Sequence, residues 1–375
     1  MGDQSWMASP REIPGVPVIA YPRPGEADVL THAHARPFDA AVRRGQQVVS
    51  TLAGYKQQGL EPDVIFVHPG WGDGFYLRDF FPGAKVIGLF EYFYLPRGAD
   101  VGFDPEFPGS FDDIFRLRAL NATQLLALES CHEGFSPTAW QRSLFPAAWR
   151  DRLSLLHEGV NTNAVAPDTD ARITLPDGTQ LVAGDEILTF VSRNLEPYRG
   201  YHVFMRALPS IMKARPQCRV VIVGGDGVSY GKRAPPGETW KNKFLAEVAE
   251  GLDMSRVHFT GTLPYNSYVK VLQVSRAHVY LTYPFVLSWS MLEAMSAGCL
   301  VVGSATPPVE EVITDGDNGL LVPFHGSQRL ADTAIEALTH PARYDRVRRR
   351  ARETVVERFD FQRVSLPGYL RLLPS

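Results

Sequence analysis

The chain has 375 residues, of which 45% are hydrophobic and 21% charged, and a formal net charge of −3 at pH 7. This length suits about two soluble globular domains, and the slightly acidic balance argues against nucleic-acid binding as the main role. Cys131, Cys218 and Cys299 lie far apart without a CxxC pair. They indicate neither a disulfide framework nor a structural zinc site, and a reducing cytoplasm fits this cysteine usage.

The N-terminal stretch matches neither a secretory signal peptide nor a myristoylation pattern. Residues 1–6 lack the charged and apolar regions of a signal peptide, and Trp6 stands where a myristoylation pattern needs Ser or Thr. No apolar run approaches the length that spans a bilayer. Residues 1–45 are rich in Pro and Gly and offer one short strand, over residues 16–21.

From residue 40 onward the first half alternates helices and strands. Apolar periodicity predicts helices over 40–58, 77–81 and 111–128, and strands over 63–68, 85–90, 131–136 and 153–157. This βαβ order predicts a parallel sheet. Residues 161–185 are polar and contain Pro167, Pro176 and Gly178, which is typical of a domain boundary.

The second half restarts the alternation. Strands are expected over 186–192, 219–223, 257–260, 278–282 and 300–303, and helices over 202–215, 241–252, 266–274, 290–297 and 328–338, with an Arg-rich helix over 343–358. The predicted fold class is α/β, with two Rossmann-like domains whose parallel sheets face a cleft, where ligands bind in such folds.

Two loops of the first half carry candidate site residues. A Gly-rich loop after residues 63–68 holds His68, Trp71 and Asp73, and it suits one wall of a cleft. A lone histidine at a strand end is more often structural. Glu91 follows the next strand together with three aromatic residues. A carboxylate among aromatic rings suits sugar binding, although a packed surface cluster reads equally well.

Two arginines flank a turn at the start of the second domain. Arg193 and Arg199 follow a predicted strand, and a guanidinium pair at a cleft mouth suits a diphosphate. The alternative is that both are solvated surface charges.

Two glycine turns end the next strands. Gly224 and Gly225 do not open a helix in the GxGxxG manner, so NAD binding is disfavoured and close backbone approach is expected. The turn at Gly261, Thr262 and Leu263 suits the grip of a flat base, or is a plain strand-to-helix turn.

The stretch from Tyr283 to Gly298 is the most informative one. A helix is expected to start near Ser288 or Ser290, and free backbone N–H groups at a helix start attract anions. Glu293 lies one turn into that helix, which would place a carboxylate near sugar hydroxyls. The alternative is an ordinary capping box, because Ser290 and Glu293 have the S-x-x-E spacing.

Several other chemistries have no motif in the chain. There is no GxxxxGK[ST] loop, no HExxH, no GxSxG and no strand-borne DxD. Asp112 and Asp113 are better read as a helix cap. The Arg-rich helix over 343–358 suits contact with anionic lipid, but a solvated terminal helix is favoured.

Taken together, these motifs resemble glycosyltransferase family 4, which comprises retaining enzymes of the GT-B fold. The resemblance is strong over 186–324 and weaker over 62–162. It rests on Ser192-Arg-Asn-Leu-Glu-Pro-Tyr-Arg-Gly200, Val223-Gly-Gly225, Phe259-Thr-Gly261, Leu292-Glu-Ala-Met-Ser-Ala-Gly298 and Glu311-Val-Ile-Thr-Asp-Gly-Asp-Asn-Gly-Leu-Leu-Val322. It implies an acceptor-side domain over 1–162, a donor-binding domain over 163–355, and a segment over 356–375 that packs back on the first domain.

The resemblance also implies roles for single residues. Arg193 and Arg199 would hold the donor diphosphate and Glu293 the ribose. The backbone of Val286, Leu287 and Ser288 would contact the phosphate or the donor sugar, and the turn at Gly261, Thr262 and Leu263 would contact the base. The donor loop would be formed by Gly224, Gly225 and Phe285. Trp71 and Asp73 would lie on the acceptor side, and Glu91 and His68 would be catalytic. Fixed positive charges would stabilise the leaving diphosphate without a metal.

Three departures from the family pattern stand out. The first glutamate of the usual E-x7-E pair is replaced by Phe285, with Glu293 as the second. Glu91 stands where the family often has a histidine, and we expect it to bind a donor-sugar or acceptor hydroxyl. Residues 1–45 show no equivalent of the usual first strand and Gly-rich loop, so the first domain is expected to be abbreviated or to lack a native segment.

The expected function is a cytoplasmic retaining glycosyltransferase that needs no cofactor or metal. It would move a hexose from a UDP-sugar or GDP-sugar to a small-molecule or glycan acceptor, without a nucleic-acid partner. Peripheral membrane contact and homo-oligomer formation stay open. Two alternatives remain: a non-catalytic GT-B homologue that binds or activates a partner transferase, and a GT-B epimerase or hydrolase of nucleotide sugars.

Overall fold

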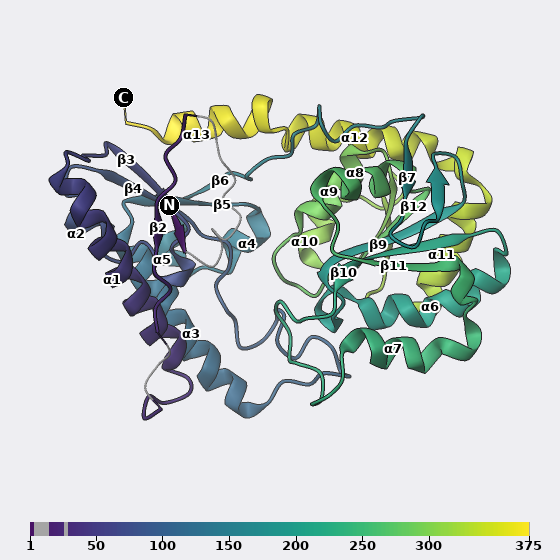
Figure 1. Ribbon diagram of the computed structural model, residues 1–375, viewed down its shortest axis with the longest axis horizontal. Helices are drawn as coiled ribbons and strands as arrows, with labels where there is room; N and C mark the ends of the chain where they lie inside the picture. Colours follow the sequence, from purple (N-terminus) through teal and green to yellow (C-terminus); the bar gives the residue numbers. More distant parts are fainter. Residues whose placement is uncertain (4–14, 26–28, 375) are drawn as a thin grey trace. The chain divides into compact units, whose positions relative to one another are not determined.

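A computed structural model describes residues 1–3, 15–25 and 29–374 (Figure 1). Residues 4–14 of the expected N-terminal stretch, including Trp6, therefore lie outside the described residues. Contacts within the chain divide it into two units, Met1–Leu156 with Tyr369–Ser375, and His157–Gly368. The division falls between Leu156 and His157, whereas the sequence placed the boundary after residue 162.

The first unit contains a parallel sheet of four strands whose spatial order follows the chain. These strands are β3 (Val64–Val67), β4 (Lys85–Leu89), β5 (Glu133–Ser136) and β6 (Leu153–Leu155). Because all four run the same way, their carboxyl ends share one edge of the sheet. The loops that begin with His68 and with Glu91 both leave this edge.

Helices cover this sheet because their apolar residues recur on one face. In α1 (Arg36–Gln57) the buried residues are Ala41, Gly45, Val48 and Leu52, a spacing of three or four residues. In α3 (Phe111–Ser130) a capping box fixes the start, since Ser110 and Asp113 exchange side-chain-to-backbone hydrogen bonds. This confirms the expected cap. The shorter helices are α2 (Leu77–Phe80), α4 (Ala139–Ser143) and α5 (Ala147–Arg150).

The C-terminal helix α13 (Leu366–Leu372) contributes its last residues to the first unit. The ring of Tyr369 packs edge-on against Phe66 and Phe135, at 5.9 and 5.3 Å between centroids. Lys85 Nζ donates to the carbonyl of Leu372 at 2.8 Å. The face of the sheet that carries Phe135 is thereby covered by a segment more than 200 residues away in the sequence.

The N-terminal strand is shorter than the sequence suggested. Only β2 (Ala20–Tyr21) forms from the expected residues 16–21, and it pairs in parallel with β1 (Gly2–Asp3), apart from the four-stranded sheet. Two residues pair on each side, so this ribbon adds few ladder hydrogen bonds.

The second unit is built on a parallel sheet of six strands in the order β11-β10-β9-β12-β13-β14. The strands are β9 (Ile187–Asn194), β10 (Arg219–Gly225), β11 (Val257–Gly261), β12 (Ala277–Tyr280), β13 (Leu300–Ser304) and β14 (Leu320–Val322). The chain builds outward from β9 to β11 and then returns to place β12 on the other side of β9. The switch point therefore lies between β9 and β12, where α/β sheets bind ligands.

Helices lie on both faces of this sheet (Figure 1). On one face are α6 (Tyr201–Ala214), α7 (Trp240–Val248) and α11 (Ser327–Thr339); on the other are α8 (Tyr265–Val274), α9 (Trp289–Ser296) and α12 (Asp345–Arg358). Met291, Leu292 and Met295 of α9 join Val301 and Val355 in one buried cluster. This cluster fixes α9, which carries Glu293. The short helix α10 (Pro307–Glu310) follows β13.

The stretch 161–185, expected to be a polar boundary segment, contains a hairpin of the second unit. Strands β7 (Arg172–Thr174) and β8 (Gln180–Val182) pair antiparallel. Leu175 and Leu181 are buried in one cluster with Val271 and Val274 of α8. The buried leucines give these otherwise polar residues a packing role in the second unit.

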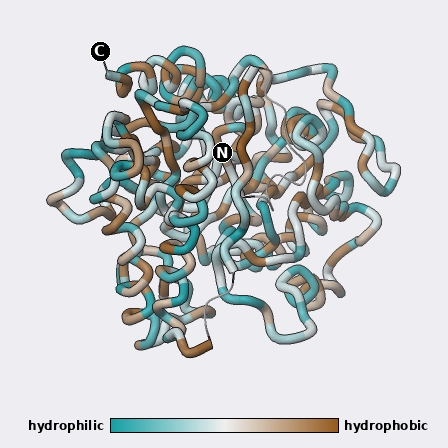
Figure 2. The backbone as a smooth tube through the Cα atoms, turned by 60° about the vertical axis from the view of Figure 1, so that its left-hand side comes forward, coloured by the Kyte–Doolittle hydropathy of each residue, from teal (hydrophilic) through white to brown (hydrophobic). Residues whose placement is uncertain are grey.

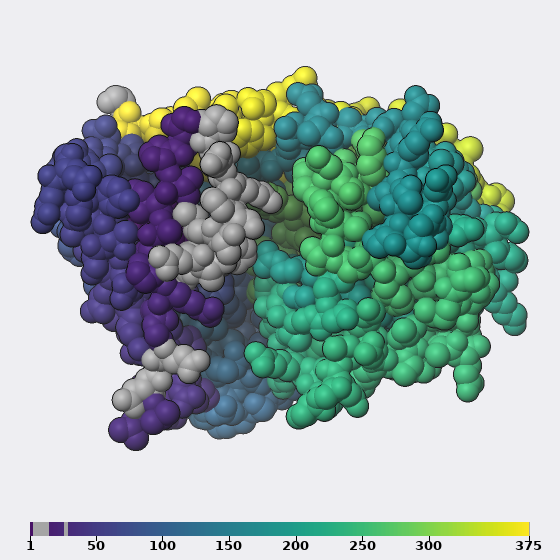
Figure 3. All heavy atoms as spheres, in the orientation of Figure 1, coloured from purple at the N-terminus to yellow at the C-terminus, as the bar shows by residue number. Residues whose placement is uncertain are grey.

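The Arg-rich helix begins at Asp345 rather than at residue 343, because Pro341–Tyr344 form a 3-10 turn. Arg352 donates to the carbonyl of Ser296 at 2.6 Å and to that of Thr162 at 3.1 Å, so it ties α12 to its neighbours. Arg346 is the most exposed of the paired arginines and faces Asp317 at 3.4 Å. The C-terminal residues, yellow in Figure 3, lie at the surface.

A helix that spans a bilayer must be both long and apolar, and the helices of the described ranges differ from this. None of them combines sufficient length with sufficient hydropathy. Figure 2 shows hydrophobic and hydrophilic residues interspersed along the chain.

Candidate functional site

Arg199 joins the two sides of the switch point in the second unit. It lies in the 3-10 turn Pro197–Arg199 after β9, and its Nη1 donates to Thr282 Oγ1 at 2.8 Å and to the carbonyl of Val286 at 3.1 Å. The same nitrogen lies 3.3 Å from the hydroxyl of Tyr280. All three acceptors belong to β12 or to the loop that leads into α9. Arg199 therefore fixes the loop predicted to meet the donor phosphates.

The two predicted diphosphate arginines have different surroundings. Arg199 is 8% exposed, and its guanidinium carbon lies 5.2 Å from the ring centre of Tyr230 and 6.0 Å from that of Phe285. Because it is buried among aromatic rings, the alternative of a solvated charge is wrong for Arg199. Arg193 is exposed, and no hydrogen bond or ion pair of its side chain is found within the described residues. It is the arginine with donors available to an incoming anion.

Phe285, at the position of the missing family glutamate, is buried and 6% exposed. Its ring lies 4.9 Å from that of Tyr230 and 5.5 Å from that of Tyr198. The position therefore contributes an apolar wall beside Arg199 in place of a carboxylate. Residue 285 therefore offers the Arg199 guanidinium an aromatic ring, at 6.0 Å, instead of a carboxylate.

Glu196 and Asn194 organise the loop that follows β10, and the sequence reasoning missed both. Glu196 is fully buried and accepts hydrogen bonds from the backbone N–H groups of Ser229, Tyr230 and Gly231, at 3.0, 3.4 and 3.0 Å. Asn194 Oδ1 accepts from the N–H of Gly227 at 3.1 Å. These bonds hold Tyr230 above Arg199. The only sequence signal was a carboxylate two residues beyond a strand.

The glycines at the end of β10 permit the close approach that was expected from them. A Cβ on Gly224 would lie 2.8 Å from the carbonyl oxygen of Ser192, and one on Gly225 would lie 2.8 Å from Asn194 Oδ1. The backbone of β10 thus packs directly on the end of β9, at a register shift between the two strands.

Glu293 lies in α9 and is 7% exposed. One carboxylate oxygen accepts from the hydroxyl of Tyr265 and the other from that of Tyr268, each at 2.7 Å. Burial raises the pKa of the carboxyl above its ordinary value, against the lowering effect of these two hydrogen bonds. The capping-box alternative is wrong, because the cap is Ser288, whose side chain accepts from the N–H of Ser290.

The loop before α9 is only partly available as a phosphate cradle. The N–H of Ser288 donates to the hydroxyl of Tyr280 at 2.8 Å, and the carbonyl of Val286 accepts from Arg199. Leu287 is buried in the core cluster of α9. The predicted base turn, Gly261 to Leu263, begins at the last residue of β11, with Gly261 in the left-handed conformation at φ +64°.

In the first unit the structure brings His68 and Glu91 together. Nε2 of His68 lies 2.9 Å from Oε2 of Glu91, and each side chain is about one third exposed, at 37% and 36%. Burial acts to lower the pKa of His68, but the hydrogen bond and charge of Glu91 outweigh it, so the pKa is raised above 6.5. Gln141, missed in the sequence, is fully buried and donates to the carbonyl of Glu91 at 2.8 Å. This bond fixes the backbone beneath the pair.

Trp71 and Asp73 follow His68 but do not join the pair. Trp71 is 65% exposed. Asp73 accepts a hydrogen bond from the hydroxyl of Tyr21, and burial together with this carboxylate raises the pKa of Tyr21 to about 12. Asp73 therefore anchors the N-terminal ribbon to the loop after β3.

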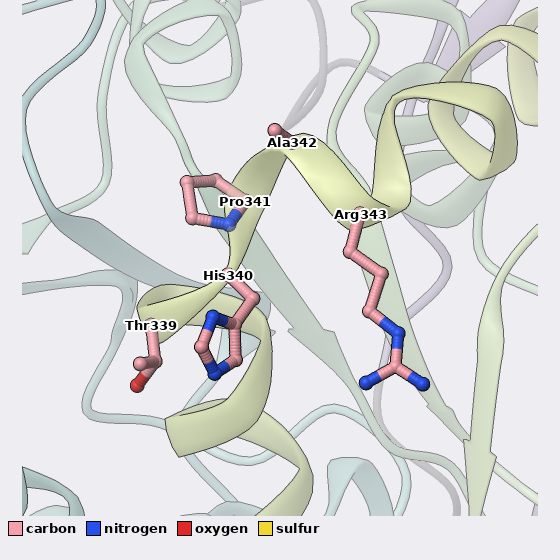
Figure 4. A pocket seen from close by; sticks show the side chains of 5 residues that line it. All are labelled: Thr339, His340, Pro341, Ala342 and Arg343. Atoms are coloured by element: carbon pink, nitrogen blue, oxygen red, sulfur yellow. The ribbon is translucent and has the colours of Figure 1, made fainter.

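Of two pockets in the second unit, one lies beside the predicted site residues and the other lies away from them. One is lined by Asp226, Gly227, Val228 and residues 233–240, beside the glycine turn after β10. The other is lined by Thr339, His340, Pro341, Ala342 and Arg343 (Figure 4). Arg215, which precedes β10, donates to Thr339 Oγ1 at 3.2 Å, so the second pocket lies at the opposite edge of the sheet from the predicted site residues.

Within residues 1–3, 15–25 and 29–374, no group of three or more His, Cys, Asp or Glu side chains is arranged to hold a metal ion.

Two family models match the chain. The model described as "Glycosyl transferase family 4 group" matches residues 4–165, and that described as "Glycosyl transferases group 1" matches residues 175–354. Solved structures with the same two-unit architecture include sucrose-phosphate synthase from Thermosynechococcus elongatus, with a TM-score of 0.68 and 19% identity, covering 93% of this chain and 82% of that one. The Anabaena protein HepE in complex with UDP and glucose has a TM-score of 0.64 and 17% identity, with 95% and 86% covered.

These likenesses define the fold class as GT-B, with two Rossmann-like units built on parallel sheets. The two family matches, one on each unit, show that the chain belongs to the family 4 type of glycosyltransferases.

The matches to the curated relatives cover about half of the chain. A D-inositol 3-phosphate glycosyltransferase of Corynebacterium aurimucosum is 31% identical over 193 residues, which are 50% of this chain and 43% of the relative. A GDP-mannose-dependent alpha-(1-6)-phosphatidylinositol monomannoside mannosyltransferase of Mycolicibacterium smegmatis is 34% identical over 221 residues, 54% of this chain and 52% of the relative. The chain spans about half the length of the curated relatives it matches.

Proposed function

We propose that the protein is a retaining, metal-independent glycosyltransferase that moves a hexose from a UDP-sugar or GDP-sugar to a small-molecule or glycan acceptor. The observation that carries the proposal is the arrangement at the switch point of the second unit. Arg199 fixes the loop before α9, and Glu293 is a buried carboxylate within that helix. A nucleoside diphosphate offers the anion and the diol that such an arrangement recognises.

The donor is held by residues with separate tasks in this proposal. Arg193, exposed and unpaired within the described residues, binds the diphosphate. Arg199 acts mainly through the loop it fixes, and Glu293 accepts hydrogen bonds from the ribose hydroxyls. Departure of the nucleoside diphosphate builds negative charge beside Arg193 and the start of α9, and these fixed charges lower the barrier.

The acceptor side is proposed to be the His68–Glu91 pair of the first unit. A carboxylate that already accepts from a histidine keeps lone pairs for a sugar hydroxyl. The glutamate expected at residue 285 is absent, so Glu91 is the carboxylate we assign to a donor-sugar or acceptor hydroxyl. Relatives named for inositol phosphate and phosphatidylinositol mannoside support a polyol or glycan acceptor.

The decisive experiment is titration of the protein with UDP, GDP and a panel of their sugars, followed by mass spectrometry of the products. We expect binding of one nucleoside diphosphate, and weakening of at least tenfold in Glu293→Gln and Arg193→Ala, since each removes a hydrogen bond to a charged group. Absence of binding to every nucleotide and nucleotide sugar would overturn the proposal.

The metal-independent and retaining aspects have their own measurements. Turnover is expected to be unchanged by EDTA, because the positive charge at the leaving group comes from arginine. Activity lost to EDTA and restored by a divalent cation would contradict this. The anomeric configuration of the product, read by NMR, must match that of the donor.

Phe285 favours one alternative, a non-catalytic homologue that binds or activates a partner transferase. An apolar wall replaces a carboxylate at this position. A protein that binds a nucleoside diphosphate but neither transfers nor hydrolyses any sugar would support this alternative. Hydrolysis or rearrangement of the donor without transfer would identify an epimerase or hydrolase instead.

A further inference from the structure

Both carboxylate oxygens of Glu293 are occupied by tyrosine hydroxyls. Tyr265 donates to Oε1 and Tyr268 to Oε2, each at 2.7 Å. A carboxylate that is only 7% exposed needs such donors, because an unpaired buried charge is costly. The two tyrosines lie in α8, on the first and second turns of the helix, so one element satisfies the whole carboxylate.

The two tyrosines are not equivalent in their packing. Tyr268 is partly buried and packs against the apolar cluster that contains Met291 and Leu292, so its hydroxyl has a fixed position. Tyr265 is 48% exposed and is the first residue of α8, separated by Pro264 from the turn at Gly261 to Leu263. An exposed aromatic side chain at a helix start can rotate into solvent, whereas one packed in a core cannot.

We propose that Tyr265 is a displaceable stand-in for the ribose and that Tyr268 is a fixed positioning residue. In the free protein the Tyr265 hydroxyl fills the place of a ribose hydroxyl on Glu293. When a nucleotide binds, the ribose diol takes over Oε1 and Tyr265 swings away from the carboxylate, while Tyr268 keeps hold of Oε2. This inference rests on the proposed function, since it assigns the ribose to Glu293.

The exchange has a consequence for nucleotide selectivity. A ribonucleotide replaces the hydrogen bond that it displaces, so the exchange is nearly balanced. A 2′-deoxynucleotide has one hydroxyl fewer with which to replace the Tyr265 bond. Tyr265 can stay on Oε1 when a deoxynucleotide binds, because the 2′-hydroxyl that would displace it is missing. Tyr265 therefore narrows the preference for ribonucleotides that Glu293 alone would provide, and its removal enlarges that preference.

The test compares Tyr265→Phe and Tyr268→Phe with the wild-type protein, using UDP, GDP and their 2′-deoxy forms in calorimetric titrations. Tyr265→Phe leaves Oε1 unsatisfied in the free protein, so we expect ribonucleotides to bind about three- to tenfold tighter, with a larger preference over the deoxy forms. Tyr268→Phe leaves Oε2 unsatisfied in both states, so ribonucleotides are expected to bind weaker. Tyr55→Phe, at an exposed position in α1, is the matched control and should change nothing.

The outcomes separate this inference from the proposed function. Suppose that the wild-type protein binds the nucleotides and that Glu293→Gln weakens this binding. If Tyr265→Phe then binds ribonucleotides no more tightly than the wild type does, the stand-in role is refuted and the proposed function survives. If the wild type binds no UDP or GDP, both fall. Thermal unfolding of each variant guards against misfolding, because a purely structural tyrosine would lower the unfolding temperature without changing the ribose-to-deoxyribose ratio.

Discussion

Replacing Arg199 by lysine tests whether this arginine holds the loop before α9. Lysine keeps the positive charge but has a compact ammonium in place of the planar fork. From this position it cannot reproduce the contacts of Nη1 with Thr282 and Val286, at 2.8 and 3.1 Å, while also lying flat against Tyr230. Hydrogen bonds to charged groups contribute about 1.5–3 kcal/mol each, so the loss of one to two of them is expected to cost about 3 kcal/mol.

The measurement is the free energy of unfolding from urea denaturation, followed by titration with the nucleoside diphosphate that the wild type binds. Arg193→Lys is the matched control for the stability measurement, because Arg193 is exposed and its side chain makes no hydrogen bond within the described residues. Its stability is expected to stay within about 0.5 kcal/mol of the wild type. An Arg199→Lys variant with wild-type stability and wild-type nucleotide affinity would refute the reasoning.

Three further variants follow from the geometry. Glu196→Gln replaces one of the oxygens that accept backbone N–H groups with a donor, so a loss of about 2 kcal/mol and faster proteolysis within residues 226–239 are expected. Ser110→Ala should lower the free energy of unfolding by about 1 kcal/mol, because the N-cap of α3 is lost. The pKa of Asp113 in the same capping box is lowered to about 2, so the contribution of this carboxylate to stability is present above pH 4 and is lost as the pH falls toward 2. Glu91→Gln removes the carboxylate that raises the pKa of His68. In the wild type the pair stabilises the folded state below pH 6.5, and this contribution is lost as the pH rises through the folded pKa of His68. NMR titration of the variant should show a lower His68 pKa, and the free energy of unfolding of the variant should depend less on pH.

The order of strands and helices could be predicted where apolar runs are long. The strand at Arg219–Gly225 and the helix at Trp289–Ser296 carry continuous or periodic apolar residues, and both form close to their expected bounds. The strands β7, β8 and β14 were missed. Each has three residues, too few for alternation to stand out from a loop, and their pairing depends on neighbours supplied by the fold.

The candidate site shows the same limit at the level of side chains. Glu293 could be singled out because its spacing from the helix start is local. Its partners Tyr265 and Tyr268 could not, since contacts across 28 and 25 residues depend on how α8 packs against α9. Glu196 was not predicted at all, because its three donors come from a loop more than 30 residues further on. The roles of these residues in binding stay predictions until nucleotides are titrated.

The long-range hydrogen bonds of Arg199 have a consequence for how the second unit folds. Its acceptors Tyr280, Thr282 and Val286 follow it by 81 to 87 residues, after two intervening strands. A guanidinium is not desolvated until these acceptors are in place, so the loop before α9 should acquire its shape only after β12 docks on β9. We therefore expect Arg199 to act late in folding and to show a low φ-value. Nucleotide binding would then require a completely folded second unit, and the rate at which binding recovers would measure the last step of refolding.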